Sequence, residues 1–95
     1  MKYPFVTVGI IVKNEEAHIR ETINSLINLD YPKKNFEILI VDGNSTDKTQ
    51  EIIKEFISKK INLRLIIEPW EKGTHGKARN LLVDNAKGEY VAFTD

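Results

Sequence analysis

The stretch FEILIVDGNSTD, residues 36 to 47, decides the fold. Its first half, Phe36 to Val41, is a short and continuously apolar run, which is typical of a strand buried on both faces. Its second half is a turn rich in side-chain oxygens, in which Ser45 or Thr46 is expected to cap the next helix. A buried strand that leads directly into a helix is the unit from which parallel sheets are built.

Similar units lie on both sides of this stretch. Upstream, FVTVGIIV (residues 5 to 12) predicts a strand, Asn14 is expected to cap the helix that follows it, and apolar side chains then recur at helical spacing up to Ile27. Downstream, INLRLIIE, KARNLLVDNA and EYVAFTD predict a strand, a helix and a strand. The order βαβαβαβ predicts an α/β, Rossmann-like fold: a mostly parallel sheet with right-handed crossovers and helices on both faces.

Length and composition limit the function classes. A chain of 95 residues forms one small domain, and 41% hydrophobic with 29% charged residues is a folded composition. Fourteen basic and fourteen acidic residues leave no net charge, which argues against nucleic acid as a partner. The absence of cysteine excludes disulfides and thiolate metal sites, and the apolar N-terminal stretch is too short for a signal peptide. We therefore expect a cytoplasmic protein, with membrane association of the full-length protein left open.

Ligands of open α/β sheets bind outside the carboxyl ends of the strands. Polar residues follow all four predicted strands: Lys13 to Glu15, Asp42 to Asn44, Glu68, and Asp95. Singly, each acid has an ordinary structural interpretation: Glu15 favours a helix dipole, Asp42 shapes a turn, and Glu68 is a solvated strand end. Together with Lys77 and Arg79 on the last crossover, they predict a site for a polar, phosphorylated ligand.

The phosphate would not be held by a glycine loop. The first strand is followed by VKNEEA, which matches neither a dinucleotide fingerprint nor a P-loop. A diphosphate at these acids would need a bridging divalent cation, for which Asp95 is the candidate ligand. Lys77 and Arg79 begin the third predicted helix, so their charges and the helix N–H groups could meet the same phosphates.

Four ordered motifs, VTVGIIVKNEE, EILIVDGNSTDKT, GKARN and GEYVAFTD, resemble the N-terminal half of family 2 glycosyltransferases with the GT-A fold. The resemblance covers almost the whole chain. It implies a nucleotide-diphosphate sugar donor, a divalent metal (Mn²⁺ or Mg²⁺) and inverting transfer of the sugar to an acceptor.

By this resemblance, Lys13 to Glu15 and the Asp42 turn flank the nucleoside, Arg79 approaches the base or the phosphates, and Asp95 opens a D-x-D metal motif. Many relatives carry two acids where this chain has Asp42-Gly43, so the base is not readable, although Gly43 lets the backbone approach a ligand closely. The expected nucleotide-sugar site comprises Lys13, Asn14, Glu15, Asp42, Gly43, Lys77 and Arg79, with Asp95 as metal ligand and the catalytic residues unassigned.

Residues 1 to 95 are thus expected to be the nucleotide-sugar-binding part of a glycosyltransferase domain without its acceptor half, inactive alone and prone to self-association. The acceptor, whether glycan, lipid or small molecule, is unassigned, as is the sugar. The alternative is a non-catalytic nucleotide-binding or signalling α/β module. A receiver-like module would place paired acids after its first strand and an aspartate after its third, where this chain has KNEE and Glu68.

Overall fold

A computed structural model describes residues 3–59, 61–68 and 75–94. Four strands and three α-helices alternate along the chain, with one short 3₁₀ helix before the second strand. In chain order they are β1 (Val6–Val12), α1 (Ile19–Ile27), η1 (Lys33–Asn35), β2 (Phe36–Asp42), α2 (Thr49–Ile57), β3 (Leu63–Ile67), α3 (His75–Asn85) and β4 (Tyr90–Phe93). The predicted βαβαβαβ order is confirmed.

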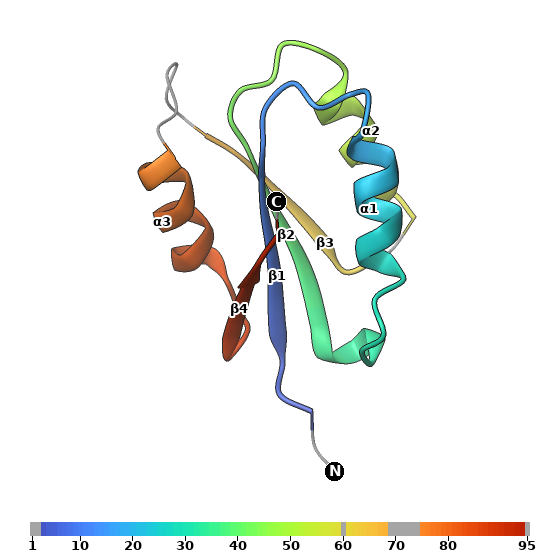
Figure 1. Ribbon diagram of the computed structural model, residues 1–95, viewed down its shortest axis with the longest axis vertical. Coiled ribbons are helices and arrows are strands. Elements are labelled where there is room, and N and C mark those ends of the chain that lie inside the picture. The colour runs from blue at the N-terminus through green and yellow to red at the C-terminus, as the bar shows by residue number, and fades with distance from the viewer. Residues whose placement is uncertain (1–2, 60, 69–74, 95) are drawn as a thin grey trace.

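The strands form one sheet in the order β3-β2-β1-β4, and every neighbouring pair is parallel. Helices α1 and α2 cover one face and α3 covers the other, as Figure 1 shows. β2 is buried along its whole length because it lies between two strands and under helices on both faces. The predicted α/β architecture is therefore confirmed. No helix in the described part of the chain is long and apolar enough to cross a membrane.

Two apolar clusters hold the layers together. The larger lies under α1 and α2, where Ile23, Ile40 and Ile53 are fully buried. The smaller lies under α3 and joins Leu82 to Leu39 and Val41 of β2. Alternate residues of β2 thus face opposite clusters, as the pleat of a strand requires.

At the amino edge of the sheet, where the parallel strands begin, the buried side chain of Glu37 connects several elements. Glu37 is 1% exposed and accepts hydrogen bonds from Thr7 Oγ1 at 2.6 Å and the Lys87 amide at 2.8 Å, and its ion pair with Arg64 Nη2 measures 2.8 Å. Burial alone would raise the pKa of Glu37, but these hydrogen bonds and the guanidinium lower it below its usual value. The network joins β1, β2, β3 and the turn before β4.

Gly88 is the tightest point of this edge. A Cβ at Gly88 would lie 2.4 Å from the Thr7 amide nitrogen and 2.8 Å from both the Tyr90 carbonyl oxygen and the Val6 carbonyl carbon. These are main-chain atoms of paired strands, so they cannot move aside without breaking the β1–β4 pairing.

Gly88→Ala should therefore lower the free energy of unfolding by at least about 2 kcal/mol. Gly43→Ala is the matched control, because a Cβ at Gly43 would meet its nearest atoms at 3.5 to 3.6 Å, an ordinary contact. Urea denaturation of both variants measures the difference, and equal stability of the two variants would contradict the assigned packing.

Candidate functional site

The carboxyl ends of β1, β2 and β3 meet at one edge of the sheet, at the top of Figure 1. Val12 lies opposite Asp42, and Asp42 lies opposite Ile67. β4 approaches the same edge beside β1, since the Thr94 amide donates to the Gly9 carbonyl at 2.9 Å. Three of the four predicted strand ends are thus brought together, and the fourth, Asp95, lies outside the described residues.

Asp42 is fully buried, with 0% of the residue exposed. Its Oδ2 accepts hydrogen bonds from the Ser45 amide at 2.8 Å and from Gln50 Nε2 at 2.7 Å, while its Oδ1 accepts from Ser45 Oγ at 2.5 Å. Buried carboxylates need such partners because water cannot supply them. In this structure Asp42 shapes the turn after β2.

Asn14 links the turn after β1 to the turn after β2. Its amide donates to Ser45 Oγ at 2.8 Å, and its Oδ1 accepts from the Thr46 amide at 2.8 Å. Its φ of 50° lies in the left-handed region, which asparagine tolerates better than most residues. The two helix caps predicted from sequence are wrong: α1 begins at Ile19 and α2 at Thr49, and neither N-cap residue makes a side-chain cap. The side chains expected to cap helices bond between the turns instead.

Asp47 and Thr49 extend the connection between the turns, and sequence reasoning assigned neither of them a role. Thr49 Oγ1 accepts from the Glu15 amide at 2.8 Å and donates to Asp47 Oδ1 at 2.5 Å, and Asp47 Oδ2 accepts from the Glu16 amide at 3.2 Å. Desolvation opposes ionisation of Asp47, but these bonds outweigh it and lower its pKa. The Glu15 side chain stays exposed, so its contribution here is through the backbone.

Three cations lie on elements that meet at this edge or begin near it. Lys13 is exposed and forms no hydrogen bond or ion pair with the residues that the structure describes, and its Cβ and Cδ lie 3.6 Å from the position of a Cβ at Gly43. Lys77 and Arg79 are the third and fifth residues of α3. The Arg79 guanidinium carbon lies 4.2 Å from the centroid of the Phe93 ring, which places this charge beside the end of β4.

Glu68 differs from its sequence-based interpretation. Taken singly, Glu68 could be interpreted as a solvated strand end, and that interpretation is wrong because only 3% of the residue is exposed. Its amide donates to the Asp42 carbonyl at 2.9 Å, which continues the β2–β3 pairing, and its carbonyl accepts from the side-chain Nδ2 of Asn44 at 2.8 Å. Tertiary packing, which no local pattern reports, buries this acid.

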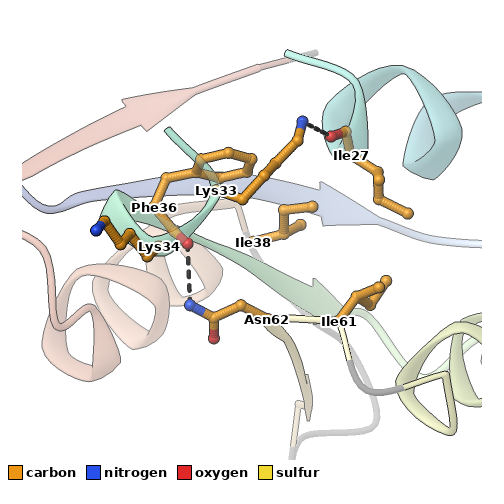
Figure 2. Close-up of a pocket in the computed structure, with 7 residues that line it drawn as sticks. All are labelled: Ile27, Lys33, Lys34, Phe36, Ile38, Ile61 and Asn62. Carbon is orange, nitrogen blue, oxygen red and sulfur yellow. Dashed lines mark hydrogen bonds between the residues drawn. The ribbon is translucent and has the colours of Figure 1, made fainter. Parts of the chain in front are cut away.

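A pocket of about 500 Å³ lies away from this edge. Figure 2 shows its lining, including Phe36 at the start of β2 and Asn62 just before β3, so it belongs to the amino edge. The Lys33 ammonium donates to the Ile27 carbonyl there, and Asn62 Nδ2 donates to the Phe36 carbonyl at 2.9 Å. None of the predicted site residues lines this pocket.

The described residues contain no group of three histidine, aspartate or glutamate side chains that could hold a metal ion. The predicted metal ligand Asp95 lies outside the described residues. The carboxyl edge does present a lysine without a partner among the described residues, nearby cations on α3 and two buried acidic side chains, on a backbone fixed by hydrogen bonds between turns. Such an edge can bind an anionic, multiply hydrogen-bonding ligand.

Asp42→Ala tests the assigned role of the Asp42 carboxylate. The change removes the acceptor of three hydrogen bonds and leaves donors of Ser45 and Gln50 without it, so we expect a loss of about 2 to 4 kcal/mol in the free energy of unfolding. Asp30→Ala, at an exposed position, is the matched control and should change stability by less than about 0.5 kcal/mol. Thermal denaturation compares them, and an Asp42→Ala variant as stable as the control would refute the assignment.

The sequence and the fold are similar to those of known glycosyltransferases. The chain is 38% identical over 92 residues to the glycosyltransferase AglE of Haloferax volcanii, an alignment that covers 97% of this chain and 30% of AglE. Among solved structures, a mannosyltransferase, PcManGT from Pyrobaculum calidifontis, in complex with GDP-Man and Mn²⁺, superposes with a TM-score of 0.85 at 30% identity, covering 96% of this chain and 27% of that one.

Residues 1 to 349 of Staphylococcus aureus TarS, in complex with UDP-GlcNAc, also superpose with a TM-score of 0.85, at 37% identity, covering 96% of this chain and 26% of that one. This chain therefore spans less than a third of the length of each of these three relatives. The model of glycosyl transferase family 2 matches residues 7–95. The chain belongs to glycosyl transferase family 2 and has the GT-A fold of its structural relatives.

Proposed function

We propose that residues 1 to 95 form the nucleotide-sugar-binding part of a glycosyltransferase, and that the donor binds at the carboxyl edge of the sheet. The observation that carries this proposal is the position of Lys13 beside Gly43, where this exposed lysine forms no hydrogen bond or ion pair with any described residue. A nucleotide sugar carries a diphosphate, and an ammonium without a carboxylate partner attracts it more strongly than a cation that is already paired.

The proposed site includes every residue expected from the sequence, and Glu15 contributes to it through its backbone amide, which donates to Thr49. Lys13, Lys77 and Arg79 supply positive charge to the diphosphate. Asn14 and Asp42 fix the two turns, so that the backbone around Gly43 is held in place before the ligand arrives. Such preorganisation favours binding because little conformational freedom is lost at the moment of association.

The positions of the α3 cations and of β4 suggest where along the carboxyl edge the diphosphate binds, namely at the end formed by β4. Arg79 packs over Phe93, so its charge lies at the β4 end of the sheet. Asp95 follows β4 in sequence and is the proposed metal ligand, with the nucleotide phosphates supplying further oxygens. A bound Mn²⁺ or Mg²⁺ would neutralise charge on the leaving diphosphate. The Mn²⁺ in PcManGT and the nucleotide sugars in PcManGT and TarS support this part of the proposal.

The proposed reaction of the whole protein is an inverting transfer. An acceptor hydroxyl oxygen forms a bond to the anomeric carbon, the bond from that carbon to the diphosphate breaks on the opposite side, and the hydroxyl proton passes to a base. No residue of this chain is assigned as that base. The sugar and the acceptor, whether glycan, lipid or small molecule, are likewise unassigned.

Self-association of this chain is also part of the proposal. Large apolar side chains lie exposed on β4, on α3 and just after α1. They include Tyr90, which is 62% exposed, Phe93, Val83 and Leu29. Exposed apolar surface next to an edge strand favours association.

Lys13→Ala tests the donor site. Isothermal titration with UDP and GDP in the presence of Mg²⁺ should show affinity about tenfold weaker than in the unsubstituted chain, because one charge-assisted contact to phosphate is lost. Lys34→Ala, a lysine at the amino edge, is the charge-matched control and should bind as the unsubstituted chain does. If both variants bound the nucleotides equally weakly, the loss of affinity would follow from net charge alone. That result would contradict a donor site at the carboxyl edge.

A further inference from the structure

Glu68 has a buried carboxyl oxygen whose role the proposed function does not explain. Within the described residues, its Oε2 is the one buried side-chain oxygen or nitrogen atom without a hydrogen-bond partner. Its counterpart at the other edge, Glu37, is equally buried but accepts bonds from Thr7, Lys87 and Arg64. An unpartnered buried acceptor destabilises the free chain, and a ligand that supplies the missing donor would remove that cost.

The strand register gives the direction of the Glu68 side chain. Ile67 lies opposite Asp42, and the bond from the Glu68 amide to the Asp42 carbonyl extends this pairing, so Glu68 lies opposite Gly43. Side chains alternate along a strand, which puts Glu68 on the α3 face, on the same side as Lys13. Gly43 contributes no side chain between them. Glu68, Gly43 and Lys13 are thus consecutive across the ends of β3, β2 and β1.

The strand order indicates which part of a bound nucleotide would lie beside Glu68. In the proposed function, on which this inference rests, the diphosphate lies toward β4 and Arg79. β3 is the opposite edge strand, three strand spacings or about 14 Å away. A nucleotide extended along the edge therefore brings its base, the group farthest from the β-phosphate, to the end of β3.

We propose that Glu68 selects the nucleobase by accepting a hydrogen bond from a ring N–H on its Watson–Crick edge. Uracil and guanine carry such an N–H. Cytosine and adenine present an unprotonated ring nitrogen there, whose lone pair would face the carboxylate oxygen. Because Glu68 is only 3% exposed in the free chain, a base that donates to its carboxylate removes little hydration from that group.

The test compares Glu68→Gln with the unsubstituted chain by isothermal titration of UDP, GDP, CDP and ADP in the presence of Mg²⁺. The unsubstituted chain should bind UDP and GDP at least about tenfold more tightly than CDP and ADP. In Glu68→Gln the side-chain amide can donate to a ring nitrogen as well as accept, so the ratio of UDP to CDP affinity should fall about tenfold.

Melting temperature separates base recognition from a structural role. Glu68→Gln should melt at or above the temperature of the unsubstituted chain, because it removes an unpartnered charge. Glu37→Gln, the matched control, should melt lower, because it weakens a partnered carboxylate, while leaving the base preference unchanged. A Glu68→Gln variant with an unchanged UDP to CDP ratio would overturn this inference alone. Failure of the unsubstituted chain to bind any of the four nucleotides would overturn the proposed donor site as well.

Discussion

The buried carboxylate of Asp42 is the interaction on which the carboxyl edge depends. It lies at the end of the central buried strand, where water cannot reach it, so the chain itself must supply its hydrogen bonds. Ser45 and Gln50 do so, and this fixes the turn after β2. Ser45 and Thr46 of the fixed turn then bond to Asn14, so the turn after β1 takes its position from the same carboxylate. One buried acid thereby arranges two loops.

The two edges of the sheet use buried glutamates in opposite ways. At the amino edge Glu37 has a guanidinium, a hydroxyl and an amide as partners, and this edge is packed so closely that a Cβ at Gly88 would meet main-chain atoms. At the carboxyl edge Glu68 is left with an unpartnered oxygen, and Gly43 has room for a Cβ that it lacks. The hydrogen bonds to Glu37 stabilise the amino edge, whereas the unpartnered oxygen of Glu68 is the feature on which the proposed base recognition at the carboxyl edge rests.

Hydrophobic periodicity predicts the element order and the parallel sheet, because a strand such as Phe36 to Val41 has no polar face to expose. The side-chain roles at the turns could not be predicted in the same way. Asn14 and Ser45 lie 31 residues apart and bond across two loops, so a rule for local capping gives the wrong partner for each. The burial of Glu68 also follows from packing rather than from its neighbours in sequence. The location of the candidate site could thus be predicted from topology. The hydrogen-bond partners of the individual atoms at that site could not.

The central claim is that a nucleotide binds across the carboxyl edge, and the most direct measurement is a titration of the ¹⁵N-labelled chain with UDP or GDP and Mg²⁺, followed by amide chemical shifts. The account predicts that shifts concentrate at residues 13 to 15, at 42 to 46 and at Glu68, and that Phe36, Asn62 and Gly88 at the amino edge stay unchanged. Shifts concentrated around Phe36 and Asn62, or no shifts at saturating nucleotide, would contradict it.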